Sequence, residues 1–255
     1  MDFRIAAEEA ARLGGQILQS WVTKFTAQEK SPANLVTEAD LASQAAIFEF
    51  LHREYPDHGF LGEENLLEHG NDSSYRWVID PLDGTSNYVH RFPYYAVSIG
   101  LEHRGRMIAG AIYDPNRDEM FSAALGQGAT LNGSPIHVSC NNTLKQAMCV
   151  ASLPVKVTRQ HPAIQKFLDI LEAAQTVQRT GSAALNLCSV ACGRIDAFWS
   201  QSLKPWDMAA GVLIVTEAGG TITQTAGGEF QLALPDLLAT NGTELHSELV
   251  SHFAR

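Results

Sequence analysis

The N-terminal part of the chain places apolar side chains at the spacing of α-helices. Apolar residues recur every three or four positions through 3–22, which predicts an amphipathic helix that packs on the core. Thr37 and Asp40 form a capping pattern ahead of a second apolar stripe, and Pro56 ends the helix that follows. The polar stretch 24–34 between these helices is typical of a loop or hairpin, which we expect to lie over the site described below.

The next part of the chain contains short runs of β-branched and aromatic residues. The runs 96–102, 107–113 and 119–124 are separated by Arg-Gly-Arg at 104–106 and by Asp-Pro-Asn at 114–116. This spacing of apolar runs and turn formers predicts a meander of antiparallel strands.

Strands and helices alternate in the second half of the chain. The pattern predicts strands at 147–152, 176–179, 195–199, 221–223 and 237–239, and helices at 162–174, 183–192, 206–217 and 244–253. Such alternation indicates a layered α/β half that packs against the first. We therefore expect one unit made of approximate halves 1–145 and 146–255.

The composition fits a globular protein, with 255 residues of which 45% are hydrophobic and 18% charged. No apolar run approaches the length of a membrane span, and the N-terminus has no signal-peptide core, so we expect a cytoplasmic protein. A net charge of -10 without clustered Lys or Arg argues against nonspecific nucleic-acid binding. The four cysteines lack metal-binding spacing, and we expect reduced core thiols at Cys140, Cys149, Cys188 and Cys192.

The stretch 77–87, with the sequence WVIDPLDGTSN, carries the clearest chemistry. Its apolar start predicts a buried strand that ends at Asp80, because Pro81 cannot donate a ladder hydrogen bond. Asp80 and Asp83 flank a bend, so both carboxylates and the Leu82 carbonyl can converge on a hard cation.

Gly84 and Thr85 follow these acids at the start of a new helix, whose free N–H groups attract phosphate. Asp, Pro and Gly are also ordinary turn formers, but the whole string favours a site that holds a metal beside a phosphate. A phosphate ester approaches convergent carboxylates only when cations lie between them. Acidic ligands and an anionic substrate together therefore imply a metal.

Four other acidic residues are candidates. Glu63 and Glu64 are adjacent, which usually indicates a solvated surface, but they follow an apolar strand. This position favours Glu63 as a metal ligand and Glu64 as a nearby carboxylate that can accept a proton. Asp40 and Asp207 each lie in a first helical turn, where a carboxylate also serves simply as a cap or as a favourable charge.

Four segments resemble the inositol monophosphatase family of metal-dependent phosphatases. They follow the family's order: LVTEAD at 35–40, GEE at 62–64, the central string with Tyr88 after it, and WDMAAG at 206–211. The resemblance implies an α-β-α-β-α layered sandwich whose two halves share the metal site. It also implies a homodimer and a phosphatase that Li⁺ inhibits.

The resemblance further implies roles for individual residues. Thr85, linked to Asp40, would orient the attacking water, and the N–H groups of Gly84 and Thr85 would bind phosphate oxygens. The segment at Ala183 would border the substrate, and Asp207 would also meet a substrate hydroxyl. Two Mg²⁺ ions and a weaker third, replaceable by Mn²⁺, would activate the water and stabilise the leaving alkoxide. The implied metal ligands are Glu63, Asp80, the carbonyl of Leu82, Asp83 and Asp207.

The implied activity is hydrolysis of inositol monophosphates and related small phosphate monoesters. Where the family often has a Glu that binds inositol hydroxyls, this chain has Ser200, with Gln201 beside it as a substitute contact. A Ser hydroxyl reaches at most one sugar hydroxyl, so we expect loose specificity. Fructose-1,6-bisphosphatases and nucleotide 3′-phosphatases share the metal motifs, and some bacterial relatives act in RNA metabolism, so these alternatives stay open.

Overall fold

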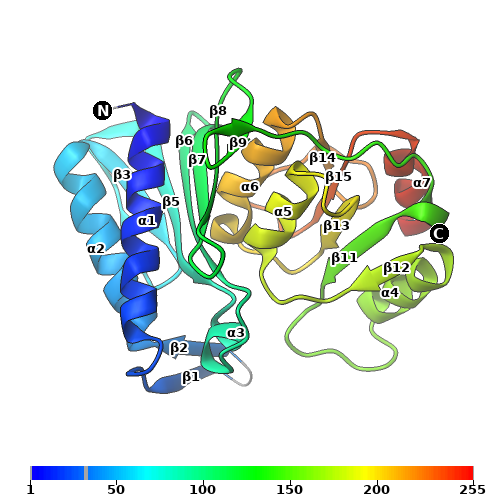
Figure 1. Cartoon of the computed structure of the whole chain (residues 1–255), viewed down its shortest axis with the longest axis horizontal. Coiled ribbons are helices and arrows are strands. Elements are labelled where there is room, and N and C mark those ends of the chain that lie inside the picture. The colour runs from blue at the N-terminus through cyan, green and yellow to red at the C-terminus, as the bar shows by residue number, and fades with distance from the viewer. Residues whose placement is uncertain (1, 32–33, 255) are drawn as a thin grey trace.

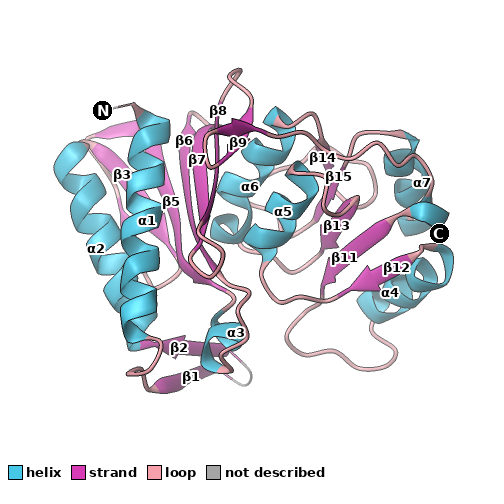
Figure 2. Cartoon of the chain, in the orientation of Figure 1, coloured by secondary structure: helices cyan, strands magenta, loops and turns pink. Residues whose placement is uncertain are grey.

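The computed structural model describes residues 2–31 and 34–254 and has five layers (Figures 1 and 2). Helices cover the outer face of each of two sheets, and a further pair of helices lies between the sheets. This is the α-β-α-β-α sandwich expected from the sequence. The outer helices on the first sheet are α1 (Phe3–Trp21) and α2 (Glu38–Glu54), the inner pair is α5 (Ala183–Ala191) and α6 (Pro205–Glu217), and the outer helices on the second sheet are α4 (Pro162–Ala173) and α7 (Glu244–Phe253).

The first sheet has eight strands in the order β10-β9-β8-β7-β6-β5-β3-β4. All of its neighbours pair antiparallel except β3 and β5, so the predicted antiparallel meander is confirmed as β6, β7 and β8. The strands are β3 (His58–Gly62), β4 (Leu67–Glu68), β5 (Asp72–Asp83), β6 (Ala96–His103), β7 (Arg106–Asp114), β8 (Glu119–Ala124), β9 (Ala129–Leu131) and β10 (Ser134–Pro135).

The second sheet is mixed and has the order β12-β11-β13-β15-β14. Strand β11 runs parallel to both β12 and β13, while β15 pairs antiparallel with β13 and β14. The strands are β11 (Met148–Ser152), β12 (Thr176–Gln178), β13 (Ala197–Ser200), β14 (Thr221–Thr223) and β15 (Leu237–Thr240).

Strand β5 continues through Pro81, so the prediction that it ends at Asp80 was wrong. Asp80 pairs with Ser98 and Asp83 pairs with Ala96, which leaves one extra residue on β5. This bulge interrupts the ladder at the proline, where no N–H is available, and pairing resumes beyond it. The bulge lies between the two acids of the central motif.

Two glycines of the first sheet leave room for helix α6 to lie against it. A Cβ at Gly110 would lie 3.0 Å from the Cα of Ala210, and a Cβ at Gly100 would lie 2.9 Å from the Cβ of Ala209. The glycines thus set the depth of the helix whose first turn carries Asp207.

The remaining described elements are short. The polar stretch after α1 contains a hairpin of β1 (Ala27–Ser31) and β2 (Asn34–Thr37), which agrees with the predicted loop or hairpin. Residues 32–33 of that stretch lie outside the described part. Helix α3 (Thr85–Val89) follows β5, and a 3₁₀ turn spans Leu144–Gln146. No helix in the described residues combines the length and the apolar character that crossing a membrane requires.

The four cysteines are free thiols, but they are not all in the core. Cys149 and Cys188 are buried, Cys192 is half-buried and Cys140 is exposed. The prediction of core thiols was therefore wrong for Cys140, which lies in the extended segment before β11.

Candidate metal and phosphate site

Three carboxylates from two elements lie together where β5 meets α6. One oxygen each of Asp80, Asp83 and Asp207 lies within 4.8 Å of the others. The first two residues flank the bulge in β5, and Asp207 lies in the first turn of α6, where its Oδ2 accepts a hydrogen bond of 2.7 Å from the backbone N–H of Lys204. A carboxylate group of this kind is the donor set of a hard divalent cation.

The carboxylates lie in an environment that disfavours their negative charges. Burial, followed by the charges of Glu63, Asp83 and Asp207, raises the pKa of Asp80 well above its usual range. Burial raises the pKa of Asp83 to about 6. Burial, followed by the charge of Asp83, raises the pKa of Asp207 to about 8. The donor set therefore fits a divalent cation, whose positive charge would offset the buried carboxylates.

The N-terminus of α5 holds the Asp83 carboxylate. The hydroxyl of Ser182 donates to Oδ2, and the backbone N–H of Ala184 donates to the same oxygen at 2.8 Å. The backbone N–H of Ala183 donates to Oδ1 at 3.3 Å. Sequence reasoning identified the small residues of this segment but missed Ser182 as a partner of Asp83, because only the fold brings the two residues together.

Glu63 and Glu64 follow β3, beside the end of β5. Glu63 is not in the group of three carboxylates, but its charge raises the pKa values of both Asp80 and Asp207. Glu64 is buried, and its backbone is fixed on both sides by Gln44, which accepts from the Glu64 N–H at 3.1 Å and donates to the Glu64 carbonyl at 3.0 Å. Glu63 thus lies near enough to act on two of the three aspartates, whereas the charge of Glu64 acts on Asp40.

Asp40 lies in the first turn of α2, where it caps the helix and also faces the site. Its Oδ2 accepts from the backbone N–H and the hydroxyl of Thr37, at 2.8 and 2.5 Å. Its Oδ1 lies 3.4 Å from the hydroxyl of Thr85, which also lies 3.2 Å from the Leu82 carbonyl. Burial, opposed by the bonds from Thr37, raises the pKa of Asp40 to about 6. The structure thus brings Asp40 and Thr85 together, as the resemblance implies.

The turn after β5 is clamped to the segment before α5. Gly84 has φ of 98° and Gly181 has φ of 92°, and a Cβ at Gly84 would lie 3.3 Å from the Gly181 carbonyl oxygen. Asn87 joins the two segments, because its side-chain amide donates to the backbone carbonyls of Tyr94 at 2.7 Å and Thr180 at 2.9 Å. The phosphate-binding turn expected at Gly84 therefore lies against the segment that holds Asp83.

A cavity of about 210 Å³ opens beside the carboxylates on the side of the second sheet. Ser200 is fully buried and does not line it; the hydroxyl of Ser200 lies 3.3 Å from that of Ser202, which does. Gln201 is exposed and donates to Thr225. The lining residues are Asp83, Ser152, Leu153, Val155, Arg179, Gly181, Ala183, Ser202, Leu203 and Asp207. Sequence reasoning missed Ser202 and Arg179, which no local pattern distinguishes.

Comparison with known proteins agrees with this geometry. The profile of the Inositol monophosphatase family matches residues 2–255. The chain belongs to the inositol monophosphatase family. It is 41% identical to an inositol-1-monophosphatase of Synechocystis sp. over 96% of this chain and 86% of that protein, and 37% identical to the Nus factor SuhB of Escherichia coli over 93% and 90%. The structure of an inositol monophosphatase from Anabaena (Nostoc) sp. superposes with a TM-score of 0.89, at 38% identity over 99% of this chain and 95% of that chain.

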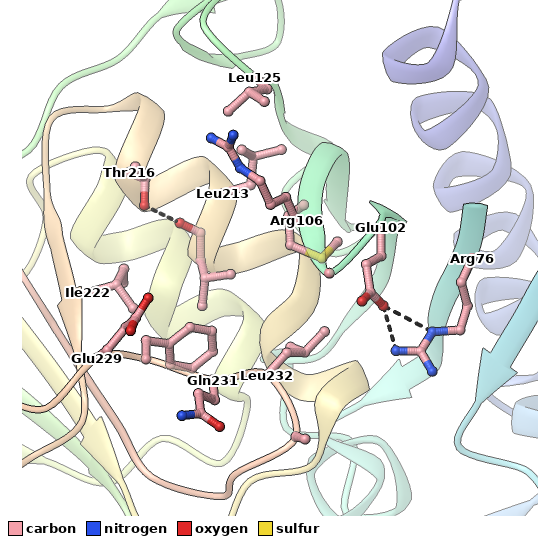
Figure 3. Close-up of a pocket in the computed structure, with 15 residues that line it drawn as sticks. Arg76, Glu102, Arg106, Leu125, Leu213, Thr216, Ile222, Glu229, Gln231 and Leu232 are labelled. Carbon is pink, nitrogen blue, oxygen red and sulfur yellow. Dashed lines mark hydrogen bonds and ion pairs between the residues drawn. The ribbon is translucent and has the colours of Figure 1, made fainter. Parts of the chain in front are cut away.

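A larger cavity lies elsewhere in the described part of this family member and has a different character. It measures about 660 Å³ and lies between α6, β14 and the segment 229–233 (Figure 3). Its walls are mainly apolar, and an ion pair of Arg76 with Glu102 at 2.5 Å lies at one end. None of the three clustered aspartates lines it. A choice of active site by volume would favour this cavity. Hydrolysis of a phosphate ester, however, needs the carboxylates and hydrogen-bond donors that lie beside the 210 Å³ cavity.

Proposed function

We propose that the protein is a Mg²⁺-dependent phosphatase that hydrolyses inositol monophosphates and related small phosphate monoesters. The observation that carries this proposal is the group of three carboxylates with raised pKa values beside the turn at Gly84. Membership of the family supports the class of reaction, and the similarity to an inositol-1-monophosphatase supports the substrate.

The metal would be held by oxygen atoms alone. Mg²⁺ is the proposed ion, in two or three sites, and Mn²⁺ is its substitute, since both prefer oxygen ligands. When bound, such ions supply a hydroxide near neutral pH and positive charge for the leaving oxygen. The proposed ligands are Glu63, Asp80, the Leu82 carbonyl, Asp83 and Asp207.

Thr85 would orient the attacking water through its hydroxyl. That hydroxyl has one proton and two acceptors in reach, the Asp40 carboxylate and the Leu82 carbonyl, so its own lone pairs stay available to accept from water. Asp40 fixes the hydroxyl direction from a position that α2 holds. Glu64 is the proposed carboxylate for transfer of the water proton, and the N–H groups of Gly84 and Thr85 are the proposed donors to phosphate oxygens.

The alcohol part of the substrate would occupy the 210 Å³ cavity beside Asp83 and Asp207. Ala183 and Ser202 line this cavity, so we propose that Ser202 contacts a substrate hydroxyl and that Ser200 supports it from behind. A neutral hydroxyl in this place imposes weaker selection than a carboxylate would, which supports hydrolysis of several monoesters.

Phosphate release with and without Mg²⁺ tests the proposal. The panel is inositol 1-phosphate, glycerol 2-phosphate, adenosine 2′-monophosphate and fructose 1,6-bisphosphate, measured with wild type, Asp83→Asn and the exposed control Asp118→Asn. We expect Mg²⁺-dependent release from several monoesters, loss in Asp83→Asn, and wild-type rates in Asp118→Asn. Release that survives metal removal or the loss of Asp83 would refute the mechanism. A strong preference for the bisphosphate would favour the alternative sugar phosphatase.

A second candidate role is regulatory, because the chain is 37% identical to a protein named Nus factor SuhB. This role does not exclude catalysis on the same fold. RNA and transcription-protein binding, measured with the catalytically silent Asp83→Asn protein, separates the two activities. We also propose a homodimer as the assembly, which light scattering of the purified protein tests.

A further inference from the structure

The Asp83 carboxylate has an uneven set of hydrogen bonds. Its Oδ2 accepts two, from the Ser182 hydroxyl and from the Ala184 N–H at 2.8 Å, whereas its Oδ1 accepts one longer bond of 3.3 Å from the Ala183 N–H. A carboxylate oxygen has two lone-pair sites. Oδ2 is therefore fully used by α5, and Oδ1 retains a site for another partner.

We propose that Ser182 is a positioning residue that holds Oδ2 of Asp83 against α5 and so reserves Oδ1 for the metal. The inference rests on the proposed function, since it assigns Asp83 to the cation site. It adds a residue from the second half of the chain to the support of a ligand from the first half.

The Ser182 hydroxyl makes two hydrogen bonds, one as an acceptor and one as a donor. As the N-cap of α5 it accepts from the backbone N–H of Leu185 at 3.2 Å, and with its proton it donates to Asp83. Ser182 is fully buried, so water does not compete for either bond. Because the residue is buried, its hydroxyl proton needs an acceptor, and the acceptor that the structure supplies is the Asp83 carboxylate.

The segment that carries Ser182 is itself fixed in place. Asn87 donates to the Thr180 carbonyl at 2.9 Å, and the Thr180 hydroxyl donates to Asn186 on α5 at 2.6 Å. The loop and the helix are thus held on both sides of Ser182. The direction of its hydroxyl is therefore set before any ligand binds.

The experiment compares Ser182→Ala, Ser182→Thr and Thr243→Ala. Thr243 is the matched control, because it caps α7 through the same kind of bond, from its hydroxyl to the Leu245 N–H at 3.3 Å, away from the site. The readouts are Mn²⁺ affinity by calorimetry, the Tm of the metal-free protein, and kcat and KM for inositol 1-phosphate.

We expect Ser182→Ala to weaken Mn²⁺ affinity about tenfold, the effect of one charge-assisted hydrogen bond. Its kcat should fall even at saturating metal, while KM changes little. Ser182→Thr keeps a hydroxyl and should stay within about twofold of wild type. Thr243→Ala should lower the Tm and leave Mn²⁺ affinity unchanged. If Ser182→Ala does not fold, Ser182→Gly replaces it, because Gly is nearly as good an N-cap and also lacks the hydroxyl.

Wild-type Mn²⁺ affinity in Ser182→Ala, with a Tm loss like that of Thr243→Ala, would reduce Ser182 to a helix cap and overturn the inference. Asp207→Asn separates this failure from failure of the proposed function. If Asp207→Asn loses Mn²⁺ binding and Ser182→Ala does not, only the role of Ser182 is wrong. If both variants bind Mn²⁺ as wild type does, the metal site itself is wrong.

Discussion

Replacing Asp207 with Asn should stabilise the metal-free protein while it removes the response to Mg²⁺. Asp207 accepts a hydrogen bond from the Lys204 N–H, and an Asn side chain can keep this bond through its carbonyl oxygen. The new amide group can donate to the neighbouring carboxylates of Asp80 and Asp83. The substitution therefore preserves the shape of the site and removes a charge that the metal-free fold disfavours.

The magnitude follows from the raised pKa of Asp207. The pKa rises from 3.8 to about 8, and each unit corresponds to about 1.4 kcal/mol. At pH 7 the folded protein keeps the Asp207 carboxyl group protonated, whereas the unfolded chain ionises it. This difference lowers the free energy of unfolding by about 4 kcal/mol. Asp207 is partly exposed, so we discount this cost for solvent screening to about 2 kcal/mol. For a chain of this size that corresponds to a Tm increase of roughly 4–8 °C.

The stabilisation by Asp207→Asn should depend on pH. Because the folded pKa is raised, the cost is absent below pH 4, grows from there to about pH 8, and stays constant above it. The Tm difference between Asp207→Asn and wild type should therefore vanish in acid and reach its maximum in mild alkali.

Thermal unfolding in chelator and in Mg²⁺ measures both effects, with Asp118→Asn as the control. Asp118 is exposed, and hydrogen bonds from Tyr113 and Arg12 lower its pKa, so its replacement should not raise the Tm. An unchanged or lower Tm of metal-free Asp207→Asn at pH 8 would refute the electrostatic reasoning. A wild-type increase of its Tm with Mg²⁺ would refute the ligand role.

Three further outcomes are expected. Thr85→Ala should lower kcat about a hundredfold and leave KM and Mn²⁺ affinity nearly unchanged, because a water-orienting hydroxyl acts in the transition state; steady-state kinetics would contradict this if only KM rose. Asn87→Ala should lower the free energy of unfolding in urea by about 1–2 kcal/mol, since the carbonyls of Tyr94 and Thr180 lose their donor. Asn87→Asp should lower it further, because its carboxylate faces the same two carbonyls. Equal stability of wild type and both variants would show that the Asn87 bonds do not hold the two segments together. Li⁺ at tens of millimolar should inhibit phosphate release in competition with Mg²⁺, as the family resemblance implies, and insensitivity would show that this member does not share the lithium response.

Most elements could be predicted from the sequence because each is encoded locally. Helix α7 and strand β8 begin and end at the predicted residues, since apolar spacing and flanking turn formers fix both ends. Strand β5 does not end where the sequence predicted. The rule that proline ends a strand is correct for a regular ladder, but it does not foresee a bulge that removes the need for the missing N–H.

The candidate site could be predicted in part. Asp80 and Asp83 lie within one motif, so their proximity is nearly a local property, and the third acid, Asp207, was found through the family resemblance. The bond of Ser182 to Asp83 could not be predicted, because 99 positions separate the two residues and neither local pattern refers to the other. The same reason explains why the sequence directed attention to Ser200, whereas Ser202 lines the cavity.

The three aspartates come together only because helix α6 packs at a fixed distance from the first sheet. The β5 acids belong to the first sheet, whereas Asp207 is carried by α6, whose approach is limited by contact of Ala210 with the backbone at Gly110. A divalent cation requires its ligands within a few tenths of an ångström, and carboxylates that repel one another do not supply that precision. The precision comes instead from the apolar contact between helix and sheet, which does not depend on charge or metal. The clustered carboxylates that would bind the metal therefore destabilise the metal-free fold. The close packing at Gly100 and Gly110, in contrast, favours both the fold and the positions of the ligands.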